Sequence, residues 1–158
     1  MKKLFLSFLF LLGACGFSPL YKEVATEGSS VPVQVEPIPN QYGFSMRQII
    51  QNALGNSSDS KYILSVSAPS FSSYDQSIDN KNFATMMRIT GTVDYHLVEK
   101  STQKTLLKSS TSLTSSYSVV KDPYATTVAE RKVKKELSEK LAEQVSLHVL
   151  GALSGVRK

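Results

Sequence analysis

The sequence predicts an α+β domain in which a mixed, mostly antiparallel four-stranded sheet packs against two helices in the order β-α-β-β-β-α. Alternating apolar and polar residues mark four extended segments between residues 31 and 120. Apolar residues at four-residue spacing mark a long helix after residue 122. Short polar turns between the later strands favour an antiparallel meander. The expected architecture is therefore a single sheet packed on helices.

The first 14 residues have the organisation of a lipoprotein signal peptide. Lys2 and Lys3 precede an apolar run over residues 4–12, and residues 12–15 read Leu-Gly-Ala-Cys, the lipobox pattern. The apolar run has nine residues, whereas a membrane-spanning helix needs roughly 20. We therefore expect residues 1–14 to be removed, and Cys15 to carry N-palmitoyl and S-diacylglycerol chains.

Cleavage would leave a lipidated tether over residues 15–30 and a single domain over residues 31–158, which is an ordinary domain size. The 18 basic side chains become 16 without Lys2 and Lys3, against 13 acidic ones, so the net charge falls from +5 to +3. This mild, scattered positive charge does not indicate a nucleic-acid interface.

The first strand and the first helix follow the tether. Valines alternate with polar residues or prolines over residues 31–38, which predicts an edge strand because proline cannot donate to a ladder. A turn is expected over residues 39–43. A short amphipathic helix is then expected over residues 44–54, with Ser45 as its N-cap and Gly55 as its stop.

Three further strands are predicted before the last helix. The first begins at Tyr62 and is expected to run past Pro69 towards Ile78. The next begins at Phe83 and has the cleanest alternation in the chain, and the last covers residues 105–120. The residues expected on the buried side of these last two strands are Phe83, Met87, Ile89, Val93, Tyr95, Leu97, Leu107, Thr111, Leu113, Tyr117 and Val119.

The last helix has a clear start signal. Asp122 is the expected N-cap and Pro123 the first-turn residue. We expect the helix to end near Leu150, with Gly151 and Gly155 as stops. Its polar face carries opposite charges at i,i+4 spacing, each pair contributing roughly 0.2–0.5 kcal/mol. These pairs are Glu130/Lys134, Lys132/Glu136, Lys135/Glu139 and Glu136/Lys140.

The sequence shows no pattern typical of catalysis. His96 is predicted on the polar face of a strand and His148 near the end of the last helix, so they do not provide three or four converging metal ligands. Acylation of Cys15 would remove the only thiol. We expect no enzymatic activity, no metal, no nucleic-acid partner and no cofactor besides the covalent lipid.

Hydroxyl side chains are concentrated in the last strand, where 11 of the 18 residues from Ser101 to Ser118 are Ser or Thr. This composition suits a solvated sheet face, and it also suits a polar surface buried in a partner such as a β-barrel lumen. Arg88 and Lys108 are candidate contacts for an anionic lipid. Arg88 interrupts an uncharged stretch over residues 84–93, although an exposed arginine on a polar face is the simpler alternative.

Residues 15–21 read Cys-Gly-Phe-Ser-Pro-Leu-Tyr and resemble the start of mature LPS-assembly lipoproteins of the LptE family. The order of predicted elements is similar over the whole chain. Gly16 also differs from the aspartate that commonly retains lipoproteins in the inner membrane.

The resemblance implies a lipid-anchored protein on the periplasmic side of the Gram-negative outer membrane. It would plug the LptD β-barrel translocon and assist lipopolysaccharide assembly at the outer leaflet. A free periplasmic lipid-binding carrier is the alternative. An enzyme that uses His96 and His148 is a third hypothesis.

Overall fold

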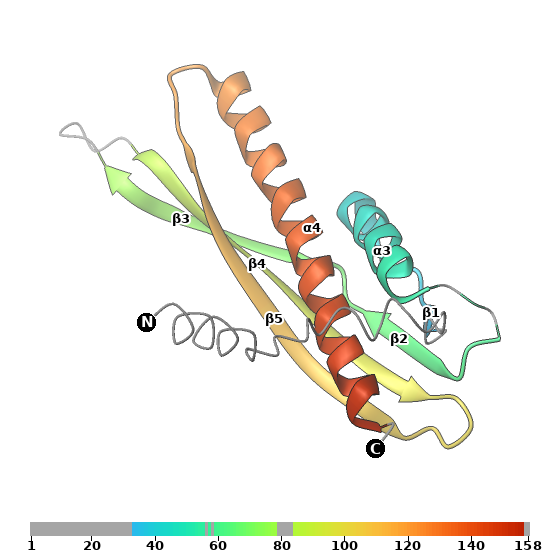
Figure 1. Ribbon diagram of the computed structural model, residues 1–158. Helices are drawn as coiled ribbons and strands as arrows, with labels where there is room; N and C mark the ends of the chain where they lie inside the picture. The colour runs from blue at the N-terminus through green and yellow to red at the C-terminus, as the bar shows by residue number, and fades with distance from the viewer. Residues whose placement is uncertain (1–32, 56, 58, 79–83, 157–158) are drawn as a thin grey trace, which may run out of the picture. The chain divides into compact units, whose positions relative to one another are not determined.

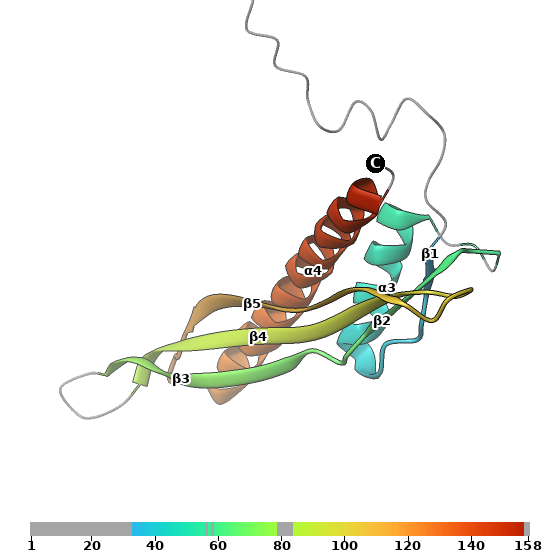
Figure 2. The same ribbon diagram turned by 90° about the horizontal axis from the view of Figure 1, so that it is seen from below.

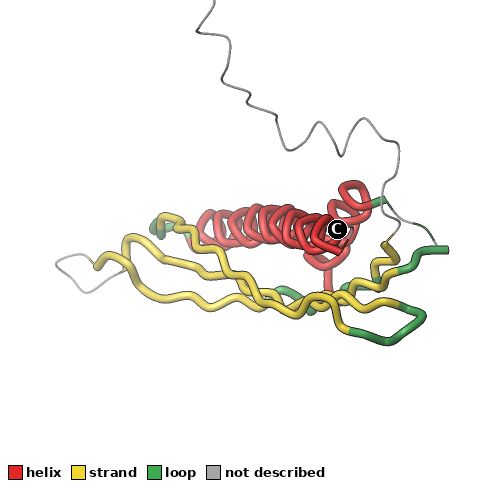
Figure 3. The backbone as a smooth tube through the Cα atoms, turned by 60° about the horizontal axis from the view of Figure 1, so that its bottom comes forward, coloured by secondary structure: helices red, strands yellow, loops and turns green. Residues whose placement is uncertain are grey.

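The computed structural model describes residues 33–55, 57, 59–78 and 84–156. Residues 31–158 form one compact unit. Its single sheet has both helices on one side (Figures 1 and 3), so the predicted α+β class is confirmed. The elements in chain order are β1 (Val33–Val35), α3 (Asn40–Leu54), β2 (Tyr62–Val66), β3 (Ser70–Ile78), β4 (Ala84–Glu99), β5 (Thr105–Ser118) and α4 (Pro123–Val156).

The sheet is organised around β4, the longest strand. β2 and β3 follow one another along one edge of β4, and β5 pairs antiparallel along its other edge. β1 pairs parallel with β2, so the sheet is mixed and mostly antiparallel, as predicted.

The described residues form five strands instead of four, because the predicted strand from Tyr62 to Ile78 is broken in the middle. Residues 67–69 lie between β2 and β3. Ser67 leaves the regular ladder, donating its N–H to the Asp94 carbonyl at 2.8 Å and accepting the Asp94 N–H on its hydroxyl at 3.0 Å. Pro69 has no N–H to donate, so the ladder resumes only at Ser70.

The predicted alternation in the strands is confirmed, with shorter ends. β1 keeps Val33 and Val35 buried, while Ile38 is buried outside the strand. Phe83 and Val31 lie outside the described residues. The last strand ends at Ser118 instead of residue 120.

The first helix begins earlier than predicted. The Asn40 side-chain oxygen accepts the backbone N–H groups of Tyr42 and Gly43 at 3.0 and 2.9 Å, so Asn40 caps the first turn and Ser45 lies inside the helix. Gly43 is therefore a buried helical residue, not part of a turn. A Cβ there would lie 2.7 Å from the Ile38 carbonyl oxygen, so the close approach requires glycine. Gly55, with φ 73°, ends the helix as predicted.

The last helix begins as predicted and ends later. Asp122 accepts the Tyr124 N–H at 2.9 Å. The predicted stops are wrong, because the helix continues through Gly151 and Gly155 to Val156. Leu153 is buried in the core, and this packing outweighs a cost of roughly 1 kcal/mol for each glycine.

Three of the four predicted ion pairs form on α4. In the described residues Glu136 lies 3.8 Å from Lys132, and no ion pair joins it to Lys140. The pairs present are Lys132–Glu136, Lys134–Glu130 and Lys135–Glu139.

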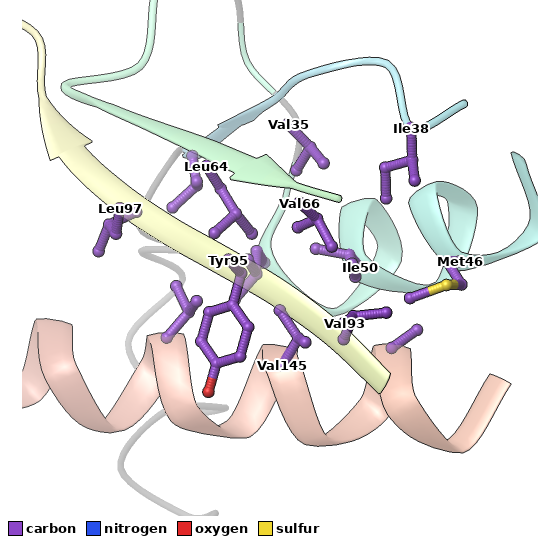
Figure 4. Packing of buried hydrophobic residues seen from close by; sticks show 14 of the residues in the cluster. Val35, Ile38, Met46, Ile50, Leu64, Val66, Val93, Tyr95, Leu97 and Val145 are labelled. Atoms are coloured by element: carbon purple, nitrogen blue, oxygen red, sulfur yellow. The ribbon is translucent and has the colours of Figure 1, made fainter. Parts of the chain in front are cut away.

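Two groups of buried side chains hold the helices on the sheet. The larger group lies between β1, β2, α3, the carboxyl half of β4 and the carboxyl half of α4 (Figure 4). The smaller group comprises Ile89, Val133 and Leu137. Tyr95 is 2% exposed, and its hydroxyl points towards α4 (Figure 4), where it hydrogen-bonds to Nδ1 of His148.

Candidate functional site

The side of the sheet that faces away from the helices is a polar surface, which we call the open face (Figures 2 and 3). Residues directly opposite in neighbouring strands point to the same side of a sheet. The Thr90 and Thr114 hydroxyls are 3.0 Å apart, and those of Thr92 and Ser112 are 2.8 Å apart. Register and alternation place these hydroxyl residues on the open face: Ser65, Ser70, Ser72, Thr90, Thr92, Ser110, Ser112, Thr114, Ser116 and Ser118.

The alternation in β5 separates its hydroxyl residues into two groups. From Lys108 to Ser118, even-numbered residues lie on the open face, where they are exposed. Odd-numbered residues face the helices, and there Thr111 is buried and donates its hydroxyl proton to the Gln144 side-chain oxygen at 3.0 Å. The predicted hydroxyl-rich surface therefore exists, but only half of the strand contributes to it.

Lys108 lies in a shallow depression of the open face. The register places it directly opposite His96, and Asp94 and Ser110 form the next pair along the same two strands. The hydroxyl of neighbouring Ser65 donates to the Glu36 carboxylate. The lining residues of the depression are Ser65, Val66, Ser67, Asp94, Tyr95, His96, Lys108, Ser109 and Ser110.

Arg88 lies near the other end of the open face. Its guanidinium donates to the Tyr74 hydroxyl at 3.3 Å and lies 5.8 Å from the centroid of that ring. Arg88 and His96 are eight positions apart on β4, a distance of roughly 27 Å along a strand. The structure therefore does not bring Arg88 and Lys108 into one site.

The two histidines lie on opposite sides of the sheet. His96 is exposed on the open face, as expected, whereas His148 contacts Tyr95 from α4. No local sequence pattern indicates the contact between His148 and Tyr95, because 53 residues separate them. Across the described ranges no cluster of three His, Cys, Asp or Glu residues is arranged to hold a metal ion.

One tyrosine on the helix side has a perturbed acidity. Burial raises the pKa of Tyr117 above its ordinary value, the Glu130 carboxylate raises this pKa further, and the Lys134 ammonium lowers it. Glu130 and Lys134 form an ion pair at 2.5 Å on α4. The Tyr117 phenol therefore keeps its proton at physiological pH.

The predicted acylation site, Cys15, lies outside the described residues, as do the predicted signal peptide and tether. Among the helices that the structure describes, none combines the length and the apolar composition needed to cross a bilayer.

Comparison with solved structures shows which fold this is. Rare lipoprotein B from Shewanella oneidensis aligns with a TM-score of 0.65 at 8% identity, over 80% of this chain and 98% of that one. The solution structure of an uncharacterized lipoprotein B from Nitrosomonas europaea aligns with a TM-score of 0.57 at 14% identity, over 78% and 87% of the two chains. At these identities the likeness shows the fold alone.

Sequence comparison gives the family. No curated protein matches the chain. The family model described as LptE, lipopolysaccharide-assembly, matches residues 31–148, which include every strand and most of α4. The chain therefore belongs to the LptE family of lipopolysaccharide-assembly proteins.

Proposed function

We propose that this protein is an outer-membrane lipoprotein, anchored by lipid chains on Cys15, that plugs the lumen of an LptD-type β-barrel and assists lipopolysaccharide assembly. Family membership supports the general role. The observation that carries the specific proposal is the open face, a sheet surface covered with hydroxyls and left free by both helices.

The chemistry of the open face suits a polar lumen. A hydroxyl both donates and accepts hydrogen bonds, so it can exchange water for the polar side chains of a barrel interior. Burying an unpaired charge is far more costly than burying a hydrogen-bonded hydroxyl. The central part of the open face carries hydroxyls and no charge, from Thr90 and Thr92 on β4 to Ser112 and Thr114 on β5.

Lys108 is the stronger of the two proposed contacts for an anionic group of lipopolysaccharide. Lys108 lines the depression opposite His96, and its ammonium is a strong hydrogen-bond donor for a phosphate oxygen. The guanidinium of Arg88 already contacts Tyr74 by a hydrogen bond and by its ring face. Asp94 in the same depression tempers the positive charge around Lys108.

The free lipid carrier is less well supported by the geometry. A carrier needs an enclosed apolar cavity for acyl chains, whereas the depression on the open face is open to solvent. The proposal includes no catalytic step, because the protein acts here as an assembly subunit.

Co-purification from native outer membranes tests the proposal. Acylated, tagged protein extracted in mild detergent is expected to carry a barrel protein in equal amount. Thr90→Arg places an unpaired charge in the centre of the open face and is expected to reduce the recovered barrel at least tenfold, since such a charge costs several kcal/mol when buried. Gln48→Arg adds the same charge on the exposed side of α3 and is the matched control.

Equal recovery of the barrel with both variants would show that the open face is not the contact surface. Recovery of the unmodified protein without any barrel would contradict the plug role itself. Circular dichroism of both variants checks that the fold is retained.

A further inference from the structure

Two of the three outer edges of the sheet are protected against pairing with another strand. On β1 the outward carbonyl of Val35 accepts two hydrogen bonds from the Arg47 guanidinium, both at 3.3 Å. β3 follows Pro69, carries a charge at Asp75, and has register shifts at its end around Ser77. Short strands, covering side chains, prolines and bulges are the usual devices that prevent edge-to-edge association.

The outer edge of β5 lacks these devices in the part of the chain that the structure describes. Its register with β4 is regular from Leu107 to Ser118, it contains no proline, and Lys108 is its only charged residue. No described strand pairs with this edge of β5. α4 covers one face of the sheet and does not continue the sheet beyond β5 (Figures 1 and 2).

The direction of the free backbone groups follows from one hydrogen bond. The Val119 N–H donates to the Thr85 carbonyl at 3.0 Å, so odd-numbered residues of β5 direct their backbone groups towards β4. Even-numbered residues therefore direct N–H and C=O outward. Beyond the register shift near Leu106, six of them form a continuous row: Lys108, Ser110, Ser112, Thr114, Ser116 and Ser118.

We propose that β5 pairs antiparallel with β5 of a second copy of this chain, centred on Leu113, so that the sheet continues across two molecules. In this register Lys108 faces Ser118 of the other copy at each end, and no like charges oppose. The hydroxyl rows would meet as Thr92 and Ser112 already do inside the sheet, at 2.8 Å. Such a contact is self-complementary and closes with two-fold symmetry.

This pairing concerns copies of the chain that are not inside a barrel, so it goes beyond the barrel proposal, and it is tested on purified residues 31–158. That segment contains every residue of the described core and no cysteine, so we expect it to fold by itself. Sedimentation equilibrium is expected to give twice the monomer mass as protein concentration rises. A monomer mass up to the solubility limit would overturn the proposal.

Disulfide trapping tests the register. Ser112→Cys and Thr114→Cys domains, mixed and oxidised, would bring two cysteines opposite each other with Cα atoms about 5.5 Å apart, a distance that a disulfide spans. A mixture of Thr90→Cys and Thr92→Cys is the control, since both residues lie on the same face in the interior strand β4. Equal cross-linking in the two mixtures would overturn the proposal.

Ser112→Pro tests the role of the backbone. The Ser112 N–H points outward and is not needed by the β4–β5 ladder, so an edge proline is compatible with the fold. We expect the dimer to be lost while the circular dichroism spectrum is retained. A Ser112→Pro dimer as tight as the unmodified one would contradict strand pairing, and failure of this variant to fold would leave the cysteine pair to decide.

Discussion

The two ends of the domain are built differently although one sheet runs through both. At the end that contains α3, two helices cover β1, β2 and the end of β4, and 17 buried residues form one cluster. At the far end the first half of α4 covers the sheet alone, and only Ile89, Val133 and Leu137 form the buried cluster. Tyr124 and Ile78 are 75% and 55% exposed there.

This difference separates the source of stability from the surface proposed to act. The α3 end supplies most of the buried apolar area, whereas hydroxyl residues of the open face occur at both ends of the sheet. Regions with few buried contacts open locally at lower cost than a well-packed core. The far end is therefore expected to be the part that adapts its conformation when a partner binds.

A matched pair of leucine substitutions gives the largest expected effect. Leu97 belongs to the large cluster and is fully buried, and Leu137 belongs to the small cluster and is 3% exposed. Leu97→Ala is expected to lower the free energy of unfolding by about 4 kcal/mol and Leu137→Ala by about 2.5 kcal/mol, because a thin cluster can collapse around the cavity. Urea unfolding followed by circular dichroism measures both.

If Leu137→Ala proves as costly as Leu97→Ala, the far end is as firmly packed as the α3 end and the comparison fails. Loss of cooperativity in one variant alone would show that the two clusters unfold separately.

A glycine substitution tests how closely the α3 end is packed. Gly43→Ala is expected to lower the free energy of unfolding by about 2 kcal/mol, since its Cβ would lie 2.7 Å from the Ile38 carbonyl oxygen, which is backbone and cannot swing aside. At Gly151 a Cβ would meet nothing within 4 Å. Gly151→Ala is therefore expected to raise the free energy of unfolding by about 0.5–1 kcal/mol, because alanine has the higher helix propensity. Thermal unfolding of the two variants gives shifts of opposite sign, and a neutral Gly43→Ala would mean that the start of α3 is loosely held.

The smallest expected effect concerns the far end at alkaline pH. The pKa of Tyr117 is raised in the folded state, chiefly by burial, so the folded chain keeps this proton at pH values where the unfolded chain loses it. The contribution to stability is complete below the ordinary tyrosine pKa of about 10 and is lost as the pH rises through the folded-state pKa. Urea midpoints between pH 9 and 11 are therefore expected to fall more steeply for the unmodified protein than for Tyr117→Phe, and parallel curves would contradict this.

Local sequence patterns determined the strands, the last helix and its start. Alternation placed Val93, Tyr95 and Leu97 on the buried side, and Asp122 marked the start of α4, because both signals depend on neighbours in the chain. Residues 15–21 and the order of the predicted elements also indicated the LptE family, whose model matches residues 31–148.

Tertiary structure decided what no local pattern encodes. Packing of Leu153 carried α4 through two glycines, and the approach of Ile38 turned a predicted turn glycine into a helical one. Pairing across β4 separated Arg88 from Lys108 and left the outer edge of β5 without a partner strand among the described residues. Short-range propensities carry about 1 kcal/mol per residue or less, so contacts between distant segments outweigh them wherever the core closes or a strand finds its partner.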